Sequence, residues 1–151
     1  MCQTLKNVEE KKERFVKETY TQIGDSVQQY LAKSAIEATH ELPIKAIICA
    51  TEHGATARLI ASYRPEVPVY AKCPKEETVR RLQLTYGVRP VFVDGNMKKN
   101  SRLVVESIKK MVEKGELSNK DLVLLIGTTP QGEYGPEYIK IRTVEHHLKH
   151  E

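Results

Sequence analysis

Long hydrophobic runs are absent from this 151-residue sequence. The two longest, Ala46 to Ala50 and Leu122 to Ile126, hold five residues each, whereas a membrane-spanning helix needs about 20. Residues 1–12 are polar and mixed in charge, without the apolar core or cleavage site of a signal peptide. We therefore expect a cytoplasmic protein that makes no contact with a membrane.

Cysteine is scarce and widely spaced, at positions 2, 49 and 73. The spacing forms neither a disulfide framework nor a metal-ligand motif, so we expect reduced thiols and neither a metal nor a cofactor. Cys49 lies within an apolar run and is expected to pack in the core. Cys73 is a weak candidate for a nucleophile: the end of a predicted strand can favour a thiolate, but Glu76 and Glu77 oppose it.

The sequence also lacks a strong excess of positive or negative charge. The sequence has 24 Lys and Arg against 20 Asp and Glu, a net charge of +4. The excess lies in residues 51–100, which hold nine basic and five acidic residues. This stretch contains one short basic helix, with Arg80 and Arg81, but no block of basic residues interleaved with aromatic ones. We therefore do not expect nucleic acid as a partner.

Short apolar runs alternate with amphipathic segments from residue 45 onward. The pattern predicts strands at 46–50, 67–71, 91–93 and 122–126 and helices at 55–62, 76–85 and 103–114. No linker divides the chain, so we expect an N-terminal helical arm over residues 1–24 and one domain over residues 25–151. Strands that alternate with helices predict a three-layer α/β/α sandwich around a mostly parallel sheet.

The last predicted strand, Ile139 to Thr143, alternates apolar and polar residues as a half-exposed edge strand does. The preceding connection, 127–136, is ten residues with three glycines and two prolines, too short for a crossover helix, so the strand should be antiparallel. An unpaired edge over Ile139 to Val144 predicts a homodimer, unless residues 145–151 or the N-terminal arm cover it. His146, His147 and His150 are expected in a solvated tail rather than in a metal site.

Two loops are candidates for a ligand site, because ligands of α/β sheets bind beyond the strand ends where the strand order reverses. The first loop enters a helix, where free N–H groups suit a phosphate; its residues are Thr51, His53, Gly54, Ala55, Thr56, Ala57 and Arg58. The second follows the fourth strand and offers Thr128, Thr129 and Gly132. Neither loop has a nucleotide-binding glycine motif, and the same residues also serve an ordinary helix cap.

Longer segments resemble the C-terminal, regulatory α/β domain of pyruvate kinase. The resemblance covers Asp25 to Val144 and is most specific in Tyr63 to Pro68 (YRPEVP) and Tyr86 to Val91 (YGVRPV). It implies a five-stranded sheet of order 3-2-1-4-5 with the last strand antiparallel, and edge strands that pair across a two-fold axis. It also implies that the first loop is the effector-phosphate loop of the family. Residues 51, 54, 56 and 57 match the family pattern, and His53 stands in place of a serine.

The chemistry of pyruvate kinase belongs to a (β/α)8 barrel of about 250 residues, which these 151 residues do not contain. We therefore expect a non-catalytic regulatory or ligand-binding domain for a phosphorylated metabolite or another phosphate-like anion. Glu133 and Glu137 in the second loop oppose a bisphosphate. Two alternatives stay open: an enzyme that acts on a small phosphorylated substrate with His53 as its acid or base, and an assembly partner with a vestigial site.

Overall fold

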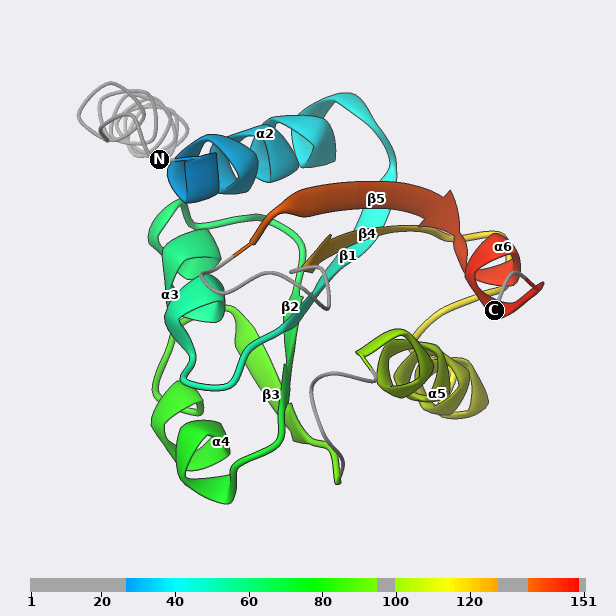
Figure 1. Ribbon diagram of the computed structural model, residues 1–151. Helices are drawn as coiled ribbons and strands as arrows, with labels where there is room; N and C mark the ends of the chain where they lie inside the picture. The colour runs from blue at the N-terminus through cyan, green and yellow to red at the C-terminus, as the bar shows by residue number, and fades with distance from the viewer. Residues whose placement is uncertain (1–26, 95–99, 128–135, 150–151) are drawn as a thin grey trace, which may run out of the picture.

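Short apolar runs and amphipathic segments alternate along the folded chain as they do in the sequence. The computed structural model describes residues 27–94, 100–127 and 136–149. These form, in order, α2 (Val27–Glu41), β1 (Ile44–Ala50), α3 (Ala55–Ser62), β2 (Val69–Cys73), α4 (Glu76–Leu82), β3 (Val88–Phe92), α5 (Asn100–Glu113), β4 (Leu122–Gly127), β5 (Tyr138–Thr143) and α6 (Val144–Lys149) (Figure 1). The predicted N-terminal arm over residues 1–24 lies outside the described residues.

One five-stranded sheet joins the strands in the order β3-β2-β1-β4-β5. The pairs β1–β2, β1–β4 and β2–β3 are parallel, and β4–β5 is antiparallel. In the register of the two central strands, Cys49 lies opposite Ile126, and across the antiparallel pair Leu124 lies opposite Ile141. Both the predicted sheet order and the antiparallel last strand are therefore confirmed.

The sheet is covered on both faces (Figure 1), which explains why β1 reads as a continuous apolar run. Ile47 and Cys49 join a core with α2, α3 and α4, whereas Ala46 and Ile48 join a second core with α5 and α6. Successive side chains of a strand point to opposite faces, so one run serves both cores. Each fully buried Ile or Leu contributes roughly 1.5–3 kcal/mol to folding.

The helix ends follow their local charges and glycines. In α4, Glu76 and Glu77 lie in the first turn and Arg80 and Arg81 in the last, an arrangement that suits the helix dipole. They form ion pairs of 3.3 and 2.7 Å one turn apart. The helix α5 ends at Glu113, and Gly115 follows with a φ of +74°. Both the acidic start of α4 and the glycine stop after α5 agree with the sequence expectations.

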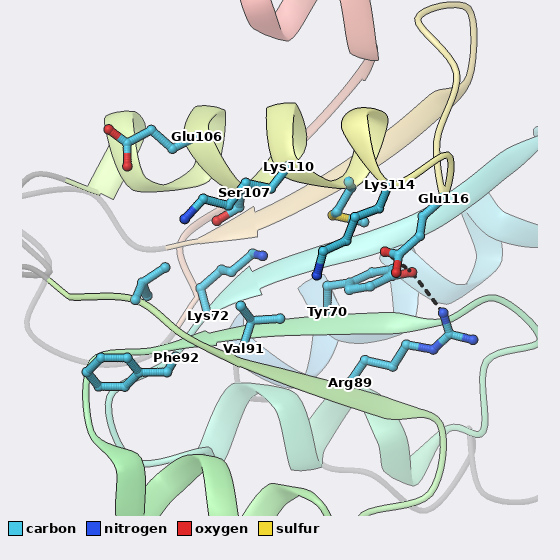
Figure 2. A pocket seen from close by; sticks show the side chains of 12 residues that line it. Tyr70, Lys72, Arg89, Val91, Phe92, Glu106, Ser107, Lys110, Lys114 and Glu116 are labelled. Atoms are coloured by element: carbon cyan, nitrogen blue, oxygen red, sulfur yellow. Dashed lines mark hydrogen bonds between the residues drawn. The ribbon is translucent and has the colours of Figure 1, made fainter.

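The largest differences from the predicted strand bounds are in β2 and β3. The strand β2 covers Val69–Cys73 rather than 67–71, so Lys72 lies inside a strand that is buried throughout. The strand β3 begins at Val88 rather than at residue 91 and contains Pro90. An edge strand tolerates proline because one side of its backbone needs no hydrogen-bond donor. A side-chain contact also joins this edge strand to β2, since Arg89 Nη1 donates to the Tyr70 hydroxyl at 2.9 Å (Figure 2).

The C-terminal segment is folded, so the expectation of a solvated tail is wrong for the part that the structure describes. Residues Val144–Lys149 form α6, and Val144 and His147 are buried. The apolar Val144 and Leu148 dock this short helix on the core that α5 covers. Of the three terminal histidines, His150 lies outside the described residues. No helix within residues 27–94, 100–127 and 136–149 is long and apolar enough to cross a membrane.

Candidate functional site

The two predicted ligand loops begin beside each other at the carboxyl ends of β1 and β4. These two strands are neighbours in the sheet, with Cys49 opposite Ile126, and the strand order reverses between them. The second loop, with Thr128, Thr129 and Gly132, lies outside the described residues. Its two flanks meet, because the Glu137 N–H donates to the Gly127 carbonyl at 2.8 Å.

Thr51 and Gly54 shape the first loop. Thr51 is buried, its N–H donates to the Lys72 carbonyl at 2.9 Å, and its Oγ1 accepts a hydrogen bond from the Gly54 N–H at 2.9 Å. Gly54 has a φ of +83°, and a Cβ there would lie 2.9 Å from Arg58 Nη1 and 3.2 Å from Leu82 Cδ2. The loop therefore needs glycine at this position, for its backbone conformation and for space.

The start of α3 leaves backbone donors available. Its first intrahelical hydrogen bond runs from the Arg58 N–H to the Gly54 carbonyl, and no side chain caps the helix. The N–H groups of Ala55, Thr56 and Ala57 precede that bond, so they have no acceptor within the helix. Thr56 and Ala57 are both buried, and Ala57 packs in the core. Uncapped N–H groups and the positive end of the helix dipole together suit an anion.

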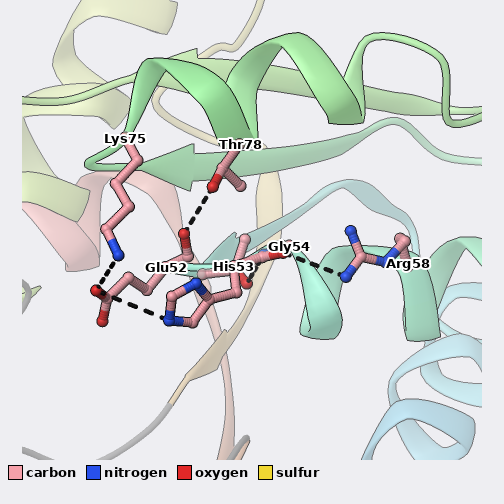
Figure 3. Close-up of polar contacts among 7 residues, drawn as sticks. Glu52, His53, Gly54, Arg58, Lys75 and Thr78 are labelled. Carbon is pink, nitrogen blue, oxygen red and sulfur yellow. Dashed lines mark hydrogen bonds and ion pairs between the residues drawn. The ribbon is translucent and has the colours of Figure 1, made fainter.

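Charged side chains flank the loop (Figure 3). Arg58 reaches back over it, and its Nη2 donates to the His53 carbonyl at 3.2 Å. Glu52 forms an ion pair of 2.7 Å with Lys75, and His53 Nε2 lies 3.8 Å from the same carboxylate oxygen. The hydrogen bond from Lys75 lowers the pKa of Glu52, so this carboxylate stays ionised at neutral pH.

Lys75 and Thr78 are the residues of this loop environment that sequence reasoning missed. Thr78 Oγ1 donates to the Glu52 carbonyl at 2.8 Å, and Lys75 holds the Glu52 carboxylate. Both residues follow β2, which is parallel to β1 with Ala50 opposite Lys72. These two residues could have been found from the strand order alone, because neighbouring parallel strands place the loops that follow them at the same edge of the sheet.

The structure brings together the first-loop residues, but it does not give His53 a fixed catalytic partner. The seven predicted residues from Thr51 to Arg58 form one continuous turn into α3. The imidazole of His53 is 73% exposed, and its only carboxylate neighbour among the described residues, Glu52, is 49% exposed and already paired with Lys75. This arrangement suits binding through the backbone better than acid–base chemistry.

The two described cysteines are core residues. Cys49 and Cys73 are fully buried, and burial raises their pKa values to about 12 and about 11. Cys73 Sγ donates to the Ala71 carbonyl at 3.6 Å. The candidate nucleophile is therefore a protonated thiol in the core, because burial outweighs any gain from its position at the end of β2. The described residues also contain no group of three or more His, Cys, Asp and Glu that could hold a metal.

Comparison with known proteins agrees with the fold. Residues 29–141 match the family model described as the pyruvate kinase alpha/beta domain. The chain is 40% identical over 124 residues to a pyruvate kinase of Borreliella burgdorferi, covering 81% of this chain and 26% of that protein. For a pyruvate kinase of Staphylococcus aureus the identity is 36% over 113 residues, covering 75% of this chain and 19% of the relative.

Solved structures show the same architecture. A Cryptosporidium parvum pyruvate kinase superposes with a TM-score of 0.78 at 24% identity, over 88% of this chain and 27% of that one. A second structure from the same organism gives a TM-score of 0.71 at 26% identity, over 80% of this chain and 23% of that one. The chain thus spans about a quarter or less of the pyruvate kinases that it matches. By sequence and by fold, the chain belongs to the family of pyruvate kinase alpha/beta domains.

Proposed function

We propose that this chain is a non-catalytic regulatory module that binds a phosphorylated metabolite, or an inorganic anion such as phosphate, at the start of α3. The observation that carries the proposal is the uncapped helix start behind Gly54, at the point where the strand order reverses. The N–H groups of residues 55–57 are the donors, and the hydroxyl of Thr56 adds a further one.

The flanking charges favour a single phosphate. Arg58 supplies a cation beside the helix start, and Lys75 offsets the negative charge of Glu52 through their ion pair. Glu137, just before β5, is exposed and carries a charge of the opposite sign to Arg58. A second phosphate close to Glu52 and Glu137 would be repelled by both, so a monophosphate fits better than a bisphosphate. The exposed His53 adds positive charge when it is protonated, which strengthens anion binding at lower pH.

Membership of the pyruvate kinase family supports a regulatory role rather than catalysis, since the resemblance implies the effector-binding domain of that enzyme. The alternative, an enzyme with His53 as its acid or base, lacks an orienting partner for the imidazole among the described residues. A catalytic role therefore has less support than a binding role.

Replacing Thr56 by Ala tests the site. One hydrogen bond to a charged acceptor contributes on the order of 1.5–3 kcal/mol, so Thr56→Ala should weaken binding of inorganic phosphate at least several-fold. Isothermal titration calorimetry measures this affinity, and a thermal-shift screen of phosphorylated glycolytic intermediates ranks the organic ligands. Thr39→Ala is the matched control, because it removes a hydroxyl that bonds the Ile36 carbonyl in α2. Equal phosphate affinity in wild type and Thr56→Ala would contradict the site assignment.

A further inference from the structure

A second concave site lies on the other face of the sheet. Side chains of β2, β3 and α5 enclose a cavity of about 200 Å³ (Figure 2), a space of roughly six or seven water molecules. The cavity is separate from the phosphate loop, because Tyr70 on β2 packs in the core covered by α5, whereas α3 packs in the opposite core. The two faces of β2 therefore serve two different sites.

Lys72 is the residue that marks this cavity as a binding site. It is 2% exposed, it lines the cavity, and its amine points toward α5 (Figure 2). Its ammonium makes no hydrogen bond or ion pair with the residues that the structure describes. Its pKa is lowered to about 8, mainly by burial; Glu116 and Cys49 act to raise this pKa, whereas Lys110 and Lys114 act to lower it. The ammonium opens into the cavity from a buried side chain and is partly desolvated there, so a bound anion would supply a partner that the described residues do not give it.

The charges around the cavity select for an anion. Four cations line it, namely Lys72, Arg89, Lys110 and Lys114, against the two carboxylates of Glu106 and Glu116. Glu116 is engaged at one end, where it accepts a hydrogen bond from the Tyr70 hydroxyl at 3.3 Å, and that hydroxyl in turn accepts from Arg89. In Figure 2, Glu106 lies toward the opposite end of α5. Between these two carboxylates the cavity is lined by the lysines Lys72, Lys110 and Lys114.

Apart from Ser107, the rest of the wall is apolar and includes Val91, Phe92 and Met111. A bare, strongly hydrated ion gains nothing from such a surface, whereas a ligand with a hydrocarbon or ring part does. We propose that the cavity between β2, β3 and α5 binds a small organic anion, a carboxylate or a phosphate monoester, with its charged group on Lys72 and its apolar part against Val91 and Met111. This site is additional to the phosphate loop.

Titration with two simple anions tests the proposal and separates the two headgroups. Benzoate carries a carboxylate and phenyl phosphate carries a phosphate on the same ring, and benzyl alcohol is the neutral comparison. We expect saturable binding of at least one anion at millimolar concentration, with amide shifts in NMR spectra that map to β2, β3 and α5. Saturable binding of neither anion, or shifts confined to residues 51–58, would overturn the proposal.

The decisive variant is Lys72→Met, which keeps an unbranched apolar side chain of similar length and removes the ammonium with its charge and its N–H donors. We expect at least a ten-fold loss of anion affinity. Lys45→Met is the matched control, because it removes a lysine from the exposed position of the neighbouring strand β1. Circular dichroism checks that both variants fold. Unchanged affinity in Lys72→Met would overturn the proposal, and so would a loss of the same size in Lys45→Met.

The two sites are told apart by a crossed comparison. Thr56→Ala should leave benzoate binding unchanged, and Lys72→Met should leave the binding of inorganic phosphate at the loop unchanged. One outcome is that inorganic phosphate binds at the loop in neither the wild type nor the variants, while benzoate still binds and still requires Lys72. In that case the proposed function is wrong, and the binding site in the cavity is still supported. If benzoate binding is lost in Thr56→Ala, the assignment to this cavity is wrong.

The pH dependence gives a second readout. Anion affinity should fall as the pH rises through about 8, where Lys72 loses its proton, and Lys72→Met should lack this step. The other charged or titratable groups that face the ammonium are Tyr70, Arg89, Glu106, Lys110, Lys114, Glu116 and, from β1, Cys49. These groups are unchanged in Lys72→Met, so the difference between the pH profiles of the wild type and the variant reports the titration of Lys72 alone. Identical profiles would contradict the proposal.

Discussion

His147 is a residue whose surroundings strongly change its acid–base chemistry. It lies in α6 with an exposed fraction of 5%, and its Nε2 has no hydrogen-bond partner among the described residues. Burial lowers its pKa to about 4, and the positive charges of Lys140, Arg142 and His146 act in the same direction. The imidazole is therefore neutral at physiological pH and packs as part of the core.

Acidification should destabilise the fold through this one side chain. The unfolded chain binds the proton near pH 6.5, whereas the folded chain binds it only near pH 4. Folding stability contributed by neutral His147 is therefore complete above pH 6.5, falls as the pH drops, and levels off below pH 4. At about 1.4 kcal/mol per pKa unit, the loss is on the order of 3 kcal/mol.

Urea denaturation across this pH range measures the effect. His147→Leu should remove the corresponding part of the slope of unfolding free energy against pH, whereas His40→Leu, at an exposed position of α2, should keep the wild-type slope. Identical slopes in wild type and His147→Leu would show that the group is not buried in its neutral form.

Single residues were the hardest feature to foresee from the sequence. The first loop was recognised because hydroxyls and glycine directly follow an apolar run. Lys72 was missed, because a lysine after an apolar run is typical of a strand end, and only the cover provided by α5 buries it. The burial of His147 was missed for the same reason, since it depends on the docking of α6 against a distant part of the chain.

At the scale of the element, the entry into α3 depends on Gly54. A side chain at its φ of +83° costs roughly 1–2 kcal/mol in backbone strain, and a Cβ would also crowd Leu82 and Arg58. Gly54→Ala should therefore lower the unfolding free energy by about 1–2 kcal/mol or more and weaken phosphate binding at the start of α3. Chemical denaturation and calorimetry measure the two effects.

Gly115→Ala is the matched control for this prediction. Gly115 has a φ of +74°, but a Cβ added there would meet no heavy atom within 4 Å, so this variant carries the backbone strain without crowding. We expect a smaller loss of stability and unchanged phosphate binding. A Gly54→Ala protein as stable as Gly115→Ala, with full phosphate affinity, would contradict the role assigned to Gly54.

Elements were foreseen where burial on both faces leaves a continuous apolar run, as in β1 and β4. The edge strand β3 was misplaced, because its sequence combines Arg89 and Pro90 with few core contacts and carries no strand period. Helix ends were clearer, since Glu76 and Gly115 act through local charge and backbone conformation rather than through tertiary contacts.

At the scale of the whole molecule, we propose that two copies pair through β5. Within the described sheet, β5 has one neighbour, β4. Its Ile139 and Ile141 pack against the core, while its outer backbone edge is left to a partner. Antiparallel pairing about a two-fold axis makes such an edge self-complementary.

Proline substitutions along β5 test this dimer. Consecutive N–H groups of a strand point to opposite sides, so one of Lys140→Pro and Ile141→Pro removes an outward donor and the other an inward one. Light scattering should show a dimeric wild type and a monomer for the outward variant, with circular dichroism confirming that it is folded. A wild type that is monomeric at tens of micromolar would end the proposal.

The two edges of the sheet differ in a way that bears on polymerisation. Pro90 gives the β3 edge a position without an N–H, opposite Ala71, so a further strand added there would lack a backbone hydrogen bond. A further strand can therefore pair with the edge of β5, whereas at the edge of β3 the missing N–H of Pro90 opposes such pairing. If β5 pairs with its own copy as proposed, the assembly closes at two chains, and the endless stacking of strands that gives fibrils is blocked.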